Sequence, residues 1–212
     1  MAVTMQAQTG NVDARFARRW VRATFAGWAL GFVLMLVMIG VSGVVGLGDR
    51  QFPIGLGMGA GVGFLQGRLI AQQVRGRRAW LIASSIGMAA PFLAFDLAGV
   101  VGIELVFSLP IAVMVGGLVV GILQWPILRK LSAASVSWIG ASTVGWSLAG
   151  SMALLNDRFL PKIPGLVGAL LYVAVVLVGG ILLGAVGGLT LQRILPPATA
   201  AASGDVDSLR AR

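Results

Sequence analysis

The stretch that decides the fold is residues 117–146, GLVVGILQWPILRKLSAASVSWIGASTVGW. Two glycines four residues apart, a glutamine, a basic turn, a tryptophan and a final glycine follow one another in it, and the same order occurs once earlier in the chain. Six positions coincide at one offset of 58 residues: Gly59, Gly63, Gln66, Trp80, Ala83 and Gly87 match Gly117, Gly121, Gln124, Trp138, Ala141 and Gly145. Because the glutamine and the tryptophan keep the same 14-residue separation in both copies, the pattern predicts a repeated helical hairpin.

Composition indicates the class of protein that contains this hairpin. Of 212 residues 58% are hydrophobic and 11% are charged, and the mean hydropathy is +0.94, which leaves too little polar material to cover a soluble globule. A helix needs about 20 apolar residues to cross the hydrocarbon core. We therefore expect an all-α, polytopic membrane protein, with six transmembrane helices near residues 23–46, 53–72, 79–97, 107–128, 136–155 and 166–193.

Basic residues predict the orientation of these helices. Thirteen of the 16 lysines and arginines fall at one end of the predicted helices: before the first helix, at the end of the second helix and in the connection to the third, in the fourth-to-fifth connection, or at and beyond the end of the sixth helix. Lysine and arginine are enriched in cytoplasmic loops, so we expect both termini to be cytoplasmic. The net charge of +9 is then explained by topology, and we expect no nucleic-acid partner.

Several reaction classes are disfavoured by missing residue types. The chain has no cysteine and no histidine, so it offers neither a thiolate nor an imidazole as nucleophile, base or metal ligand. We find no phosphate-binding loop or other catalytic motif. The sequence therefore predicts a protein that is not an enzyme, with no metal site and no cofactor.

The first and last helices supply a third, divided copy of the hairpin. Positions matching the second half of the unit occur in the first helix, where Trp20, Gly27 and Trp28 align with Trp138, Gly145 and Trp146. The first half would come from the sixth helix. We thus expect one domain over residues 15–196, with units at about 53–97, 107–155 and, divided, 166–196 with 15–46, around a pseudo-threefold axis; residues 1–14 and 197–212 are expected to be flexible cytoplasmic tails.

Glycines at four-residue spacing predict close helix packing. Small residues at i and i+4 allow two helix backbones to approach in a membrane. The candidate packing positions, a glycine zipper, are Gly55, Gly59, Gly63, Gly117, Gly121, Gly180, Gly184 and Gly188. Two alternatives for the glycine-rich segment 53–72 are an unwound stretch that lines a solute pathway and, from its alternation over 55–63, a barrel strand.

Polar and aromatic positions give the remaining candidates. Gln66 and Gln124 would form a polar ring with Thr190 or Gln192, two registers that the sequence leaves open, or would simply tie neighbouring helices together.

Four tryptophans are expected to form an aromatic belt at the inner boundary: Trp20, Trp80, Trp125 and Trp138. The deeper Trp28 and Trp146 would fill space beside glycines or contact a lipid or hydrophobic ligand. Asp96 and Glu104 would lie at the outer interface, or mark an ion site if they are buried in the membrane.

The run of residues 117–129, followed by Trp138 and the Gly145-Trp146 pair, resembles a group of uncharacterised bacterial six-helix integral membrane proteins with Gln-Trp-x-x-Leu-Arg segments. The earlier copy departs from that motif, because Gly67 stands where the later copy has Trp125. The resemblance implies the bacterial inner membrane and carries no activity. From the residues we expect a noncatalytic scaffold or accessory subunit whose glycine grooves pack against partner helices or membrane lipids, the partners being other membrane subunits or its own copies. The alternative is a small-solute or ion transporter or channel along the pseudo-threefold axis.

Overall fold

The computed structural model describes residues 2–105, 108–159 and 163–195 of the chain. Its elements are α1 (Ala2–Val44), α2 (Phe52–Ile70), α3 (Arg77–Val100), α4 (Leu109–Leu128), a short 3-10 helix η1 (Ala133–Val136), α5 (Ser137–Phe159) and α6 (Gly165–Ile194). The described part contains helices and no strands, so the predicted all-α class is confirmed and the barrel-strand alternative is wrong.

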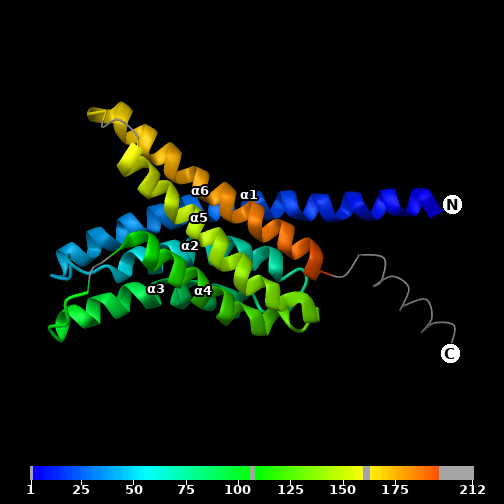
Figure 1. Ribbon diagram of the computed structural model, residues 1–212, viewed down its shortest axis with the longest axis horizontal. Helices are drawn as coiled ribbons and strands as arrows, with labels where there is room; N and C mark the ends of the chain where they lie inside the picture. Colours follow the sequence, from blue (N-terminus) through cyan, green and yellow to red (C-terminus); the bar gives the residue numbers. More distant parts are fainter. Residues whose placement is uncertain (1, 106–107, 160–162, 196–212) are drawn as a thin grey trace.

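The six long helices follow the six predicted segments closely, with one difference at the start. α1 begins at Ala2, so residues 2–14, which we expected to form a disordered tail, continue the first helix beyond the bundle (Figure 1). Ala, Met and Gln in this segment are good helix formers, and no proline interrupts it. The second predicted tail, 197–212, lies outside the described residues.

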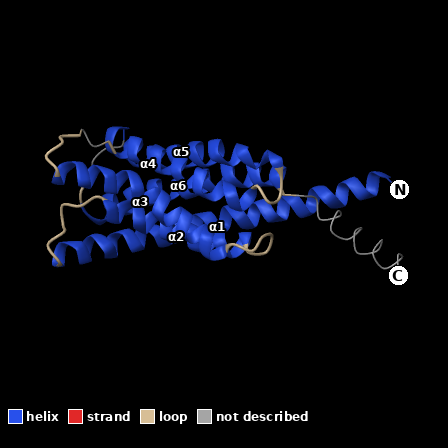
Figure 2. Cartoon of the chain, turned by 90° about the horizontal axis from the view of Figure 1, so that it is seen from below, coloured by secondary structure: helices blue, strands red, loops and turns tan. Residues whose placement is uncertain are grey.

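The helices form a closed ring. Each helix packs against the next one along the chain, and α6 packs against α1, so that the first and last helices are neighbours (Figures 1 and 2). The start of the bundled part of α1 and the end of α6 lie at one end of the bundle. This closure is what the divided third hairpin requires.

Four helices are long and apolar enough to cross a membrane: Arg15–Val44 of α1, α3, α4 and α6. This supports the expected class of membrane protein. α2 and α5 fall outside this set. Both belong to the same ring as the four apolar helices.

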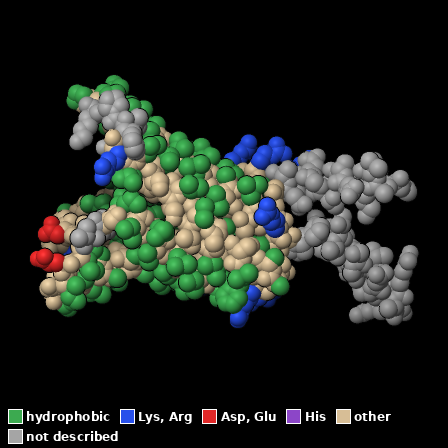
Figure 3. Space-filling view, in the orientation of Figure 1, with side chains coloured by type: hydrophobic (Ala, Val, Ile, Leu, Met, Phe, Trp, Pro, Cys, Tyr) green, Lys and Arg blue, Asp and Glu red, His purple; other side chains and the backbone are tan. Residues whose placement is uncertain are grey.

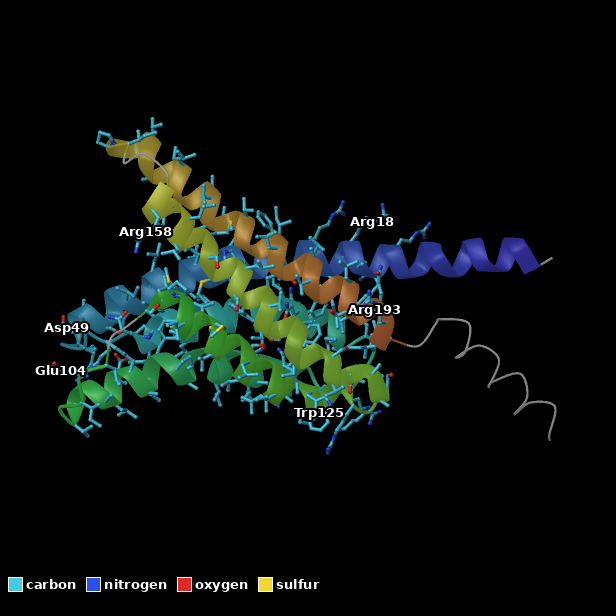
Figure 4. The ribbon with its side chains drawn as sticks, viewed as in Figure 1. Arg18, Asp49, Glu104, Trp125, Arg158 and Arg193 are labelled. Carbon is cyan, nitrogen blue, oxygen red and sulfur yellow. The ribbon has the colours of Figure 1, made fainter. Side chains whose placement is uncertain are left out.

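Charged side chains separate along the long axis of the bundle. Arginines and lysines gather at the end where α1 enters and α6 leaves, and acidic groups lie at the other end (Figure 3). Figure 4 shows Arg18 and Arg193 at the first end, and Asp49, Glu104 and Arg158 at the second. Between the two ends the surface is rich in exposed Ile, Leu and Val, as expected for helices in contact with lipid.

Buried side chains form two clusters stacked along the bundle. The cluster nearer the basic end is built around Trp20, Trp80 and Trp138 together with Ile70, Leu128 and Leu191. The second, deeper cluster contains Trp28, Met88 and Trp146 with Val62, Val120 and Leu183. Side chains from all six helices therefore fill the bundle where these two clusters lie.

Candidate functional site

Two glutamines lie inside the bundle, each hydrogen-bonded to the tryptophan 14 residues later. Trp138 Nε1 donates to Gln124 Oε1 at 2.8 Å, and Trp80 Nε1 donates to Gln66 Oε1 at 3.3 Å. Both glutamines are almost wholly buried, with 1% and 5% of their surfaces exposed. The repeated Gln–Trp spacing in the sequence is thus a repeated contact between one helix and the next.

The nitrogen end of each glutamine side chain reaches a hydroxyl on the helix on its other side. Gln66 Nε2 donates to Thr24 Oγ1 at 3.0 Å, and Gln124 Nε2 donates to Ser84 Oγ at 2.8 Å. The oxygen and the nitrogen of each amide therefore both have a hydrogen-bond partner. Gln66 joins α2 to α1 and α3, and Gln124 joins α4 to α3 and α5. Sequence reasoning missed these hydroxyls, although a hydroxyl residue follows four positions after each of the three tryptophans, as Thr24, Ser84 and Ser142.

On α6, the position equivalent to Gln66 and Gln124 is occupied by Gly187. A Cβ on Gly184 would meet Val21 and Thr24, as one on Gly121 would meet Ile139 and Ser142. Three residues further along each helix stand Gly187 and Gln124. Trp20 Nε1 lies 2.8 Å from the Cβ that Gly187 lacks, and this nitrogen is buried without a hydrogen-bond partner in the described structure.

The three tryptophans that we expected in an interfacial belt lie instead at the centre of the bundle. Their ring centroids are 5.6–6.0 Å apart in all three pairs of Trp20, Trp80 and Trp138, and none is more than 3% exposed. The belt prediction is wrong for these three, because their indoles pack against one another inside the bundle, where hydrogen bonds to Gln66 and Gln124 also hold Trp80 and Trp138. Trp125 alone lies at the edge, under the guanidinium of Arg129 (Figure 4).

A second aromatic layer lies one step deeper. The ring centroids of Trp28 and Trp146 are 5.5 Å apart, their exposed fractions are 4% and 3%, and Met88 belongs to the same cluster. Trp28 Nε1 donates to the carbonyl oxygen of Val176 at 2.9 Å. Both indoles are held among the bundle's own side chains, which is the space-filling arrangement that the sequence favours for large rings beside glycines.

The structure does not bring Thr190 to the two glutamines. Thr190 Oγ1 donates to the carbonyl of Val186 within α6, and the residue lines an exposed groove between α5 and α6. Gln192 is partly buried, five residues beyond Gly187. Of the four candidates for a polar ring, the structure thus places only Gln66 and Gln124 in the inner layer.

The eight candidate packing glycines all face other helices of the same chain. Gly55, Gly59 and Gly63 contact α3, Gly117 and Gly121 contact α5, and Gly180, Gly184 and Gly188 contact α1. Gly57 and Gly61 on the other side of α2 face α1, where Met35 and Gly31 lie within 2.6 Å of the missing Cβ atoms. α2 is a continuous helix over its full length, packed on two sides, with no unwound segment.

Asp96 lies near the end of α3, where it caps a neighbouring helix. Its carboxylate oxygens accept hydrogen bonds of 2.8–2.9 Å from the backbone N–H groups of Gln51 and Phe52, at the start of α2. Arg50 Nη1 donates to the Asp96 carbonyl. This is a structural use of a buried carboxylate. Glu104 is exposed in the α3–α4 connection. Within the described ranges no three acidic side chains group closely enough to hold a metal ion.

Fold and contacts together define a helical bundle of the membrane class, with an interior occupied by aromatic and amide side chains. No family model, curated protein or solved structure matches this chain.

Proposed function

We propose that this chain is a noncatalytic integral membrane scaffold or accessory subunit. The observation that carries the proposal is the filled interior, in which Trp20, Trp80 and Trp138 pack together above Trp28 and Trp146. A channel or transporter needs polar groups that exchange partners with a solute or with water. Here both glutamine amides are already bonded to neighbouring helices.

The proposal includes three copies of one two-helix unit around a pseudo-threefold axis. It is supported by equivalent contacts on all three sides of the ring. A Cβ on Gly27 would meet Val62, one on Gly87 would meet Val120, and one on Gly145 would meet Leu183. These contacts join α1 to α2, α3 to α4 and α5 to α6, at equivalent positions of the three helix pairs.

The proposal also includes six membrane-spanning helices with both ends in the cytoplasm of a bacterial cell. Segregation of basic side chains to one end of the bundle supports this orientation through the positive-inside rule (Figure 3). The resemblance to bacterial six-helix proteins supports the inner membrane as the location. Because the eight candidate packing glycines face helices of the same chain, partners and lipids would mainly contact the outward-facing Ile, Leu and Val side chains.

A solute-flux experiment separates this proposal from the transporter alternative. Purified protein in liposomes should give no more leakage of entrapped ions or small neutral solutes than protein-free liposomes. A flux that disappears in the double variant Gln66→Leu, Gln124→Leu would support a conducting polar layer and contradict the scaffold. The exposed Gln73→Leu is the matched control, because Gln73 lies in the α2–α3 connection away from the interior.

A further inference from the structure

An exposed groove runs between α5 and α6 near the basic end of the bundle. It has a volume of about 620 Å³, and its lining includes Gly140, Ala141 and Val144 of α5, Val186 of α6, and Ser137 and Arg193 at the basic end. This volume lies within the range of about 300–1,000 Å³ that small-molecule sites occupy. Gly140 opens the groove, because a Cβ there would meet nothing within 4 Å.

The two equivalent helix pairs, α1–α2 and α3–α4, lack this groove's combination of residues. Gly140 lies five residues before Gly145, whereas Ile82 and Arg22 lie five residues before the equivalent Gly87 and Gly27. Arg193 lies nine residues after Gly184, and the residues nine after Gly121 and Gly63 are Lys130 and Gln72. A glycine and a guanidinium therefore occur together only between α5 and α6. On α3, Ile82 projects outward at the position of Gly140, with 55% of its surface exposed.

Charge indicates what the groove binds. Arg193 is exposed, and it forms no hydrogen bond or ion pair with another residue in the described ranges. The opposite side of α6 carries a second groove, lined by Arg18 and Arg22 of α1, so that guanidinium groups flank α6 on both sides. The acidic side chains Asp49 and Glu104 lie at the far end of the bundle (Figure 4). An anionic group at the mouth would be favoured, because a guanidinium can bind a phosphate through two parallel hydrogen bonds.

We propose that the α5–α6 groove binds one anionic phospholipid, with its phosphate at Arg193 and an acyl chain along Gly140, Val144 and Val186. An anionic phospholipid joins a negative group to a long apolar chain, which matches a cation above an apolar floor. The inference rests on the proposed membrane role and makes it more specific, since it names one lipid class and one face of the bundle.

Native mass spectrometry of the full-length protein tests the site. Phosphatidylglycerol and phosphatidylcholine with identical acyl chains are titrated separately, and the affinity of the first bound lipid is measured. Wild-type protein should bind phosphatidylglycerol at least about tenfold more tightly. Arg193→Gln should weaken phosphatidylglycerol binding about fivefold, as expected for one lost interfacial cation, and should weaken phosphatidylcholine binding less, because the choline ammonium already offsets the phosphate charge.

Two further variants decide between the groove and general surface charge. Gly140→Ile places at this position the residue that α3 carries there, fills the groove and should weaken both lipids, while Gly140→Ala should change little. Lys130→Gln removes the charge at the equivalent position of the α3–α4 pair, where Ile82 stands in place of Gly140, and should have no effect.

Equal losses in Lys130→Gln and Arg193→Gln would overturn the inference, because the binding would then be nonspecific. A change of oligomeric mass in Gly140→Ile, with lipid binding intact, would overturn it in favour of a helix–helix interface. Solute flux through wild-type liposomes would contradict the scaffold role without altering these lipid affinities, so the two failures are distinguishable.

Discussion

Gln124 shows what one side chain does in this bundle. Its oxygen accepts from Trp138 of α5 and its nitrogen donates to Ser84 of α3, so one residue of α4 joins the helices on both sides. Hydrogen bonds between membrane helices contribute only about 0.6–2 kcal/mol each. The larger effect comes from removal of the amide, because the indole N–H of Trp138 would then be buried without an acceptor.

Gln124→Leu should therefore lower the free energy of unfolding by about 2–3 kcal/mol. Gln66→Leu should lower it less, because the Trp80–Gln66 hydrogen bond is longer, at 3.3 Å. The measurement is reversible unfolding in mixed micelles, followed by tryptophan fluorescence. The exposed Gln73→Leu should stay within about 0.5 kcal/mol of wild type. Equal stability of all three variants would show that these amides hold no helices together.

Gly187 and Gly140 make a second residue-scale prediction, in opposite directions. A Cβ at Gly187 would lie 2.8 Å from Trp20 Nε1, whereas one at Gly140 would contact nothing within 4 Å. Gly187→Ala should destabilise the bundle by about 1–3 kcal/mol through overpacking. Gly140→Ala should stabilise it by up to about 1 kcal/mol, because alanine is the better helix former. Thermal unfolding of the two variants side by side checks both signs, and a stabilised Gly187→Ala variant would contradict the position assigned to Trp20.

At the scale of elements, α2 depends on α3 for its beginning. The start of α2 has no side-chain cap of its own, and the first N–H groups of a helix lack intrahelical acceptors. Asp96, located near the end of α3, supplies carboxylate oxygens to the N–H groups of Gln51 and Phe52. The capping residue is thus more than 40 positions away in sequence, on the next helix of the ring.

Asp96→Ala should free the start of α2 while leaving the rest of the ring in place. Loss of a helix cap costs about 0.5–2 kcal/mol, and the favourable interaction of the carboxylate with the helix dipole is lost with it. Amide hydrogen exchange should accelerate at Phe52 and Ile54 and remain slow around Gln124. Asp96→Asn keeps one acceptor oxygen and should show a smaller change. The exposed Asp49→Ala is the control, and exchange at Phe52 as fast in that variant as in Asp96→Ala would contradict the cap.

The whole molecule shows how far sequence reasoning reaches. Helical periodicity and apolar length predicted the six helices, because helix formation in an apolar chain is decided locally. The direction in which a side chain points depends instead on contacts with neighbouring helices. By sequence the three tryptophans Trp20, Trp80 and Trp138 suit an interfacial belt. Contacts between neighbouring helices place them inside instead: all three rings pack together, and Trp80 and Trp138 also bond to glutamines. The Asp96 cap also required knowledge of which helices are neighbours.

The sequence also could not predict the place of Gly187 opposite Trp20, because that depends on how α6 packs against α1. By sequence alone, Thr190 and Gln192 competed for the third place in the polar layer, since α6 has glycines at several compatible registers. Contacts of Gly184 with Val21 and Thr24 select the register, and the selected residue has no side chain. The sequence analysis assumed a polar residue at the third position, so it could not predict a layer of two glutamines and one glycine.

Membrane topology is the whole-molecule prediction that remains, and α2 and α5 are its critical helices because they are the two that fall outside the set of four apolar spans. Since the chain has no cysteine, single cysteines can be introduced without a background signal. Gly48→Cys and Gln73→Cys lie before and after α2, and Ser132→Cys and Arg158→Cys lie before α5 and at its far end. A membrane-impermeant maleimide should label Gly48→Cys and Arg158→Cys in intact cells, and Gln73→Cys and Ser132→Cys only after permeabilisation, because the basic end should face the cytoplasm. Labelling of Gly48→Cys and Gln73→Cys from the same side would show that α2 does not cross, and the same result for the second pair would exclude α5; either outcome would contradict a bundle of three transmembrane hairpins.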